Sequence, residues 1–262
     1  MRRMPHLVLL FVLFLASCTP AGVASSEPRI LVVFAAASLI DAFTEIGKNF
    51  EAEHPGVNVT FNFGGSQALR TQIEEGAPAD VFASANKTEM DTLVAGAHIK
   101  EGTPQIFLSN KLVVILPASN PAALTKLEDL SKSGIKLILA AEEVPVGNYT
   151  RQALDLMNGS FGTDFKEKVL ANVVSNEDNV RQVVAKVQLG EADAGIVYTS
   201  DAVAAPDLRT IEIPAELNVI AEYPISTLMQ SNHTDLADAF IKYVLSDEGQ
   251  SILQKWGFAS PE

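Results

Sequence analysis

The feature that most constrains the fold is a regular alternation of strand and helix patterns, which begins near residue 30. An apolar, β-branched run at 30–36 predicts a buried strand, and apolar side chains at helical spacing follow as far as Phe50. Ser38 and Asp41 stand three residues apart where the helix starts, as in a capping box. Ser38 is therefore predicted to lie at a helix N-terminus, where free backbone N–H groups and the helix dipole favour an anion.

The same order of strand, turn and helix recurs along the chain. Residues 57–63 alternate as a strand does, Gly64 and Gly65 permit a tight turn, and Ser66 opens a second predicted helix. Strict alternation predicts mostly parallel sheets covered by helices, and in such sheets ligands bind beyond the carboxyl ends of the strands. Both serines are predicted to lie at such ends. Further strands are predicted at 79–84, 111–117, 135–140, 192–198, 209–213 and 218–223, and further helices at 87–94, 126–133, 150–157, 180–189 and 235–245.

The first 18 residues have the pattern of a bacterial lipoprotein signal peptide. A basic start is followed by an apolar run at 7–15 that is too short to span a membrane. The run ends in Leu-Ala-Ser-Cys18, which resembles a lipobox, in which the cysteine becomes the lipid-modified first residue of the mature protein. Residues 19–28 are predicted to be a flexible tether. We therefore expect an extracytoplasmic protein anchored to the membrane through Cys18, on the periplasmic side if the cell has two membranes.

Charge and cysteine content exclude several classes of protein. Removal of the leader also removes Arg2 and Arg3, which leaves 17 basic against 32 acidic side chains and a net charge of −15. Without a basic stripe, nucleic acid is not an expected partner. Because Cys18 is the only cysteine, neither a disulfide framework nor a cysteine-based metal site is expected. An anion bound by so acidic a chain must be captured by a local site and not by the overall field.

Six short motifs resemble the molybdate-binding protein of molybdate ABC transporters, and they occur in order between Arg29 and Phe258. They are Ala36-Ala-Ser-Leu39, Gly65-Ser66, Gly76-Ala-Pro-Ala-Asp-Val-Phe82, Val144-Pro-Val-Gly-Asn-Tyr149, Asn179-Val-Arg181 and Gly195-Ile-Val-Tyr-Thr-Ser-Asp201. The ending, Ser246-Asp-Glu-Gly-Gln-Ser251 with Gly257-Phe258, is similar to this family too.

This resemblance implies an α/β protein with the type II periplasmic-binding-protein fold, in which two lobes close on a small ligand. Lobe 1 is expected at 29–110 and 224–262, and lobe 2 at 111–223. The implied partners are the ABC transporter permease and the molybdate or tungstate oxyanion. The protein is expected to be a monomer, to have no catalytic activity and to need no cofactor.

The resemblance also implies the ligand set. The oxyanion would be held by the hydroxyls of Ser38, Ser66 and Tyr198 and by the backbone N–H groups of Val146 and Val180. These groups would hold molybdenum as an oxyanion and not as a bare cation. The family often has Ala where this chain has Val146, and we expect the change to alter packing more than binding because the contact is through the main chain.

The chemistry of molybdate agrees with these five donors. Molybdate at neutral pH is a fully deprotonated dianion, so its oxygens only accept hydrogen bonds and the ideal site presents donors alone. Hydrogen bonds to a charged group contribute about 1.5–3 kcal/mol each, so five to seven of them can give submicromolar affinity after the ordering cost of closure. No Arg or Lys is required.

Enzymes and cation binders fit the sequence less well. A serine hydrolase needs Gly-x-Ser-x-Gly, and the segment that starts at Gly64 lacks the final glycine. The histidines lack the paired spacing of a zinc site. Ferric-binding proteins of the same fold use clustered tyrosines, whereas the tyrosines here are scattered: Tyr149, Tyr198, Tyr223 and Tyr243.

Other tetrahedral oxyanions are the closest alternatives. Phosphate carries a proton at neutral pH and needs a carboxylate acceptor, but the nearby carboxylates are better explained as helix-start residues. Sulfate has no proton, so only cavity size could exclude it. Tungstate is nearly the same size as molybdate, and the sequence does not distinguish the two.

Overall fold

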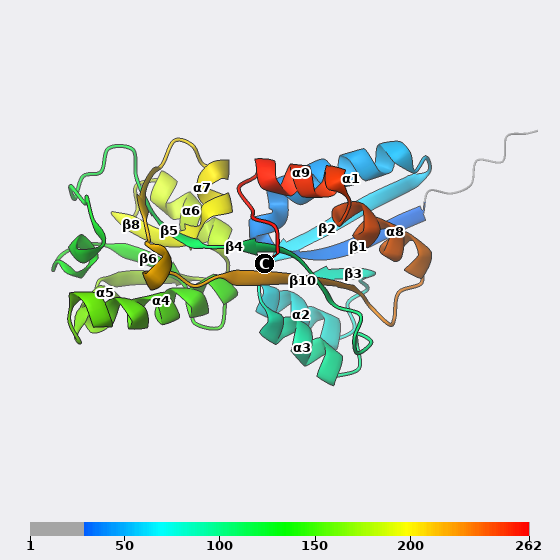
Figure 1. Ribbon diagram of the computed structural model, residues 1–262, viewed down its shortest axis with the longest axis horizontal. Helices are drawn as coiled ribbons and strands as arrows, with labels where there is room; N and C mark the ends of the chain where they lie inside the picture. The colour runs from blue at the N-terminus through cyan, green and yellow to red at the C-terminus, as the bar shows by residue number, and fades with distance from the viewer. Residues whose placement is uncertain (1–28, 262) are drawn as a thin grey trace, which may run out of the picture.

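The computed structural model describes residues 29–261 and consists of two α/β lobes that lie side by side (Figure 1). Each lobe is built on one five-stranded sheet, in the order β2-β1-β3-β10-β4 for lobe 1 and β7-β6-β8-β5-β9 for lobe 2. The predicted architecture of two α/β lobes is therefore confirmed. The predicted signal peptide, its Cys18 and the tether at 19–28 lie outside the described residues.

Lobe 1 contains both ends of the described chain. Its strands are β1 (Arg29–Ala36), β2 (Val57–Gly64), β3 (Val81–Ala83), β4 (Gln105–Asn110) and β10 (Ala221–Thr227). Its helices are the 3-10 turn η1 (Ala37–Leu39), α1 (Ile40–Glu53), α2 (Ser66–Glu74), α3 (Lys87–Ala95), α8 (Thr234–Val244) and α9 (Asp247–Lys255).

Lobe 2 is formed by the middle of the chain. Its strands are β5 (Leu112–Leu116), β6 (Leu137–Ala140), β7 (Val173–Glu177), β8 (Ala194–Tyr198) and β9 (Arg209–Glu212). Its helices are η2 (Leu127–Ser131), α4 (Pro145–Phe161), α5 (Phe165–Ala171), α6 (Val180–Gln188), α7 (Thr199–Ala204) and η3 (Ala215–Leu217).

One strand in each sheet runs against the other four. In lobe 1 it is β10, which is antiparallel to both β3 and β4 while β1, β2 and β3 are mutually parallel. In lobe 2 it is β5, which is antiparallel to β8 and β9 while β6, β7 and β8 are parallel. Both reversed strands follow a crossing between the lobes, so the chain passes from lobe 1 to lobe 2 before β5 and returns before β10.

The crossings lie close to the expected lobe boundaries. The first falls at Lys111, between β4 and β5. The second expected boundary, between Tyr223 and Pro224, falls inside β10, whose pairing with β4 already starts at Ala221. The pairing register shifts between Tyr223 and Pro224, because proline has no N–H to give to the ladder.

Tight packing fixes the elements that carry the site. In lobe 1, Phe43 of α1 meets Phe240 of α8 edge to face, with ring centroids 5.9 Å apart. In lobe 2, a Cβ added to Gly195 of β8 would lie 2.8 Å from the Val183 side chain, so α6 lies directly against the sheet. In each lobe, this packing positions the carboxyl ends of the strands and the N-termini of the helices that face the other lobe.

Several elements differ from the sequence predictions. Strands β4 and β7 and helices α5, α7 and α9 were not predicted, and α4 starts at Pro145 and not at residue 150. Proline suits the first position of a helix because its missing N–H would have no partner there. Within residues 29–261, no helix combines the length and apolarity needed to cross a membrane.

Candidate ligand-binding site

A small cavity lies between the lobes, where the carboxyl ends of β1, β2 and β8 meet the N-termini of α2, α4 and α6. Its volume is about 20 Å³, far below the roughly 300–1,000 Å³ of pockets for drug-sized ligands. The space suits one small ion or a water molecule, and not an organic substrate. All five residues predicted to hold the anion are in its wall: Ser38, Ser66, Val146, Val180 and Tyr198.

Ser38 lies in the 3-10 turn η1, between β1 and α1, and its side chain is buried. Its Oγ is 3.0 Å from the hydroxyl of Tyr223 in β10. Neither η1 nor α1 has a side-chain cap, so the predicted capping box of Ser38 and Asp41 is wrong. The cause is the inserted 3-10 turn, since Ser38 stays within it and Asp41 forms an ion pair with Arg181 of lobe 2.

Ser66 is the first residue of α2 and is almost completely buried. Its Oγ accepts a hydrogen bond from the backbone N–H of Ala85, at 3.0 Å. A hydroxyl that accepts from a backbone N–H keeps its own proton free to donate. Ser66 can therefore give that proton to a ligand in the cavity.

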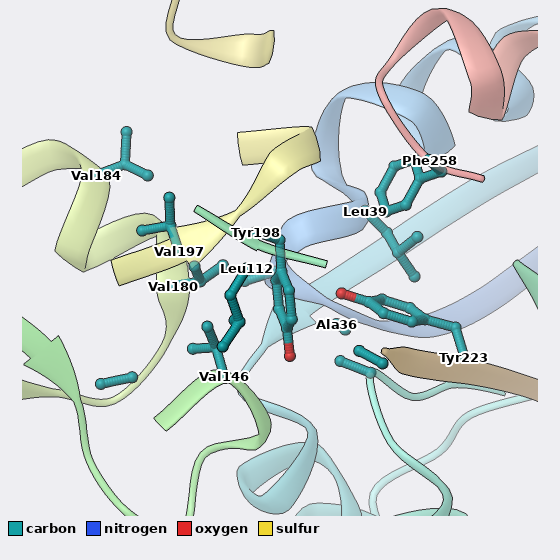
Figure 2. Close-up of a cluster of buried hydrophobic side chains, with 14 of the residues drawn as sticks. Ala36, Leu39, Leu112, Val146, Val180, Val184, Val197, Tyr198, Tyr223 and Phe258 are labelled. Atoms are coloured by element: carbon teal, nitrogen blue, oxygen red, sulfur yellow. The ribbon is translucent and has the colours of Figure 1, made fainter. Parts of the chain in front are cut away.

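Val146 and Val180 lie in the first turns of α4 and α6. The N–H groups of a first turn have no partner within the helix. The cap residue of α6, Asn179, accepts from the N–H of Gln182, which leaves the Val180 N–H uncapped. The two valine side chains are buried in the cluster drawn in Figure 2, so the helix N-termini are held firmly at the cavity.

Tyr198 ends β8, and its ring lies edge-on to that of Tyr223, with centroids 5.8 Å apart (Figure 2). Its buried hydroxyl has no hydrogen-bond partner among residues 29–261. Burial raises the pKa of Tyr198 well above its usual value, so the hydroxyl stays protonated and can donate. A buried polar group without a partner costs about 1–3 kcal/mol. A ligand oxygen in this cavity would supply the missing acceptor.

The wall of the cavity carries no ionisable group other than the tyrosine hydroxyl. Its remaining polar groups are two serine hydroxyls, the Asn179 side chain and the main chain. The Asn179 oxygen is occupied by the Gln182 N–H. Such a wall suits a fully deprotonated anion, because it offers donors and no carboxylate that could accept a proton from the ligand.

The lobes are closed on this cavity. A Cβ added to Gly65 of lobe 1 would lie 2.5 Å from the backbone oxygen of Asp178 in lobe 2. The same oxygen accepts a hydrogen bond from the Gln67 side chain, at 3.3 Å. Glycine at position 65 is therefore what lets the two backbones approach so closely.

Two groups that support the site escaped the sequence analysis. Tyr223 was counted among the scattered tyrosines, although its hydroxyl contacts Ser38. The Ala85 amide has no side-chain signal at all. Both contacts join residues far apart in the chain, so a local pattern could not have found them.

A larger groove of about 860 Å³ lies on lobe 1, between β10, α8 and the segment at 100–105. None of the five predicted ligand residues lines it. In the part of the chain that the structure describes, no group of three or more His, Cys, Asp or Glu residues could hold a metal ion. The cavity between the lobes is therefore the candidate site.

Comparison with known proteins identifies the family. The family model described as bacterial extracellular solute-binding protein matches residues 31–259. This chain belongs to that family.

The curated relatives of this solute-binding protein include molybdate-binding proteins. The molybdate-binding protein ModA of Mycobacterium tuberculosis is 40% identical over 244 residues, which cover 93% of this chain and 89% of the relative. The Escherichia coli protein of the same name is 34% identical, with 91% and 92% covered. A Bacillus subtilis protein, provisionally named as the ABC transporter substrate-binding lipoprotein YvgL, is 32% identical, with 90% and 88% covered. The predicted resemblance is confirmed.

Solved structures of the family's fold include binders of two oxyanions. The periplasmic molybdate-binding protein of Azotobacter vinelandii has a TM-score of 0.77 at 20% identity, covering 88% of this chain and all of the other. The sulfate-binding protein SubI of M. tuberculosis has a TM-score of 0.81 at 18% identity, covering 89% and 88%. At these identities the matches establish the periplasmic-binding-protein fold and leave the ligand open.

Proposed function

We propose that this protein captures molybdate, and also tungstate, outside the cytoplasm and delivers it to the permease of an ABC transporter. The observation that carries the proposal is the buried Tyr198 hydroxyl, which lacks an acceptor within residues 29–261 and borders a cavity lined with other donors. The relatives at 32–40% identity support the same class of ligand and transporter.

The donor set accounts for binding without a cationic side chain. The hydroxyls of Ser38, Ser66 and Tyr198 and the backbone N–H groups of Val146 and Val180 give at least five hydrogen bonds to one dianion. At about 1.5–3 kcal/mol each, they outweigh the cost of ordering the two lobes.

Selection among anions follows from proton count and size. Phosphate carries a proton at neutral pH, and no carboxylate in the cavity wall can accept it. Sulfate is fully deprotonated but has shorter bonds to oxygen, so fewer donors reach it at once. Sulfate binding by a protein of the same fold is the alternative function. It is the weaker alternative because the sulfate-binding relative is only 25% identical to this chain.

Parallel calorimetric titration with molybdate, tungstate, sulfate and phosphate tests the proposal. We expect submicromolar binding of molybdate and tungstate, weak binding of sulfate and none of phosphate. Tight phosphate binding would contradict the donor-only site, and sulfate binding tighter than molybdate binding would favour the alternative function.

We further propose that the protein is a monomer that binds its ligand and catalyses no reaction. The wall of the cavity has no His, Cys, Lys or carboxylate to act as nucleophile or general base. Its small volume also leaves no room for an organic substrate beside an anion.

The proposed membrane anchor is a lipid on Cys18. In the Cys18→Ser variant we expect the protein to leave the membrane fraction while its affinity for molybdate stays unchanged, because none of the five proposed ligand residues belongs to the leader. Fractionation of expressing cells, followed by titration of the released protein, measures both. Continued detergent-sensitive recovery of the variant with membranes would overturn the lipid assignment.

A further inference from the structure

Arg181 makes contacts in both lobes. It belongs to the first turn of α6 in lobe 2, and its Nε lies 3.2 Å from Oδ1 of Asp201 in α7 of the same lobe. Across the cleft, its guanidinium pairs with the carboxylate of Asp41 in α1, and its Nε donates to the backbone oxygen of Ala37 at 3.3 Å. We name these contacts of Arg181 with Asp41 and Ala37 the interlobe bridge.

The interlobe bridge is unusual among the ion pairs of the molecule. Every other ion pair found within residues 29–261 joins two residues of one lobe. Rotation of the lobes apart would separate Arg181 from Asp41 but would leave its pair with Asp201 intact. The bridge can therefore exist only when the cleft is closed.

The bridge also links the two halves of the site, although neither Arg181 nor Asp41 lines the cavity. Asp201 accepts a hydrogen bond from the backbone N–H of Tyr198, at 3.3 Å. At the other end, Ala37 directly precedes Ser38. Arg181 itself is not in the wall of the cavity, so its removal would take no donor away from the anion.

We propose that Arg181 is a positioning residue whose bridge to Asp41 and Ala37 stabilises the closed lobes and slows release of the bound anion. The inference rests on the proposed function in that it needs an anion whose release can be measured. It adds a residue to the binding machinery that neither contacts the ligand nor belongs to the predicted donor set.

The two carboxyl groups beside Arg181 differ in burial. Asp201 is completely buried, and burial raises the pKa of its carboxyl to about 7, while the charge of Arg181 acts in the opposite direction. Loss of Arg181 would leave that carboxyl without a cation. Asp41 is 31% exposed, so water can solvate it when the lobes separate. Arg181 thus keeps its contact with Asp201 in lobe 2 when the lobes separate, whereas its contact with Asp41 in lobe 1 can break and form again.

The test compares release rates in four proteins: the parent, Asp41→Asn, Arg181→Met and Arg70→Met. Asp41→Asn removes the reversible partner and leaves the buried Asp201 paired, so it should fold even if Arg181→Met does not. Arg70→Met is the matched control, because Arg70 is equally exposed, at 24% against 23%, but its partners Glu74 and Glu89 are both in lobe 1.

Each protein is loaded with radiolabelled molybdate and chased with unlabelled molybdate, and its affinity is measured by calorimetry. In Asp41→Asn we expect release to be about threefold to thirtyfold faster with an unchanged association rate, because the bridge exists only in the closed state from which the anion must leave. Folded Arg181→Met should show at least the same effect. The Arg70→Met control should release molybdate at the parent's rate.

Release from Asp41→Asn at the parent's rate would overturn the bridge, as would an equal acceleration in Arg70→Met. Failure of the parent to bind molybdate would instead overturn the proposed function. The same chase with labelled sulfate would then still test the bridge, since closure of the lobes does not depend on which anion they enclose.

Discussion

The two lobes contribute different kinds of donor to the same cavity. Lobe 1 provides two side-chain hydroxyls, Ser38 and Ser66, each beside a second group of its own lobe: the Tyr223 hydroxyl and the Ala85 N–H. Lobe 2 provides the N-termini of α4 and α6 through Val146 and Val180, together with the Tyr198 hydroxyl, which has no hydrogen-bond partner in the described part of the chain.

The difference shows where a change of sequence can alter the ligand. A hydroxyl is lost by a single substitution, whereas a backbone N–H remains with every side chain except that of proline. We call Ser38 and Ser66 the serine half of the site, and Val146 and Val180 the valine half. Anion affinity should therefore be sensitive to mutation in the serine half. It should tolerate mutation in the valine half as long as helices α4 and α6 stay in place.

The largest effect is expected from a charge in the serine half. In Ser66→Asp a carboxylate would face the dianion in a desolvated cleft, and we expect affinity for molybdate to fall by more than about a hundredfold. Ser66→Asn is the control of equal size without the charge. Calorimetry of both proteins measures the difference, and an aspartate variant within a few-fold of the parent would refute a donor-only site.

Loss of one serine hydroxyl should cost less. Ser38→Ala and Ser66→Ala each remove one donor, and we expect each to weaken molybdate binding by about 1.5–3 kcal/mol, or roughly tenfold to a hundredfold. Titration of the two variants measures this loss. If neither variant loses affinity, the serine half does not donate to the anion.

The smallest change in affinity is expected in the valine half. Val146→Ala keeps the backbone N–H, so we expect molybdate affinity to change by less than about threefold, even though loss of the buried methyl groups lowers the free energy of unfolding by about 1–3 kcal/mol. Calorimetry and denaturant unfolding measure the two effects. An affinity loss as large as that of Ser66→Ala would show that the side chain, and not the main chain, controls the site.

The same contrast explains how much could be predicted from the sequence. The strand, turn and helix around Ser66 depend on nearby residues, so the local sequence pattern predicted them. The five ligand residues were predicted from the family motifs, and the structure places all five in the wall of one cavity. At Ser38 the local pattern failed, since a 3-10 turn and a capped α-helix start with similar residues. Its true partner, Tyr223, is 185 positions away.

Two of the elements that escaped prediction, β7 and α5, have weak local patterns. Strand β7 lies at the edge of its sheet and is only partly buried, so Val173 and Val174 are its only apolar residues. Helix α5 is short and contains three charged residues in seven. The pairing of Arg181 with Asp41 requires both lobes in place, and no sequence spacing encodes it.

The measurement that tests the account most directly is the effect of Tyr198→Phe on affinity and on stability without ligand. The hydroxyl has no partner among residues 29–261, so its removal should not lower the free energy of unfolding without ligand and should raise it by up to about 3 kcal/mol, while molybdate affinity falls roughly tenfold to a hundredfold. Titration calorimetry and denaturant unfolding of the same preparation give both values. A variant whose affinity for molybdate is within twofold of the parent's would contradict the claim that this hydroxyl donates a hydrogen bond to the bound anion.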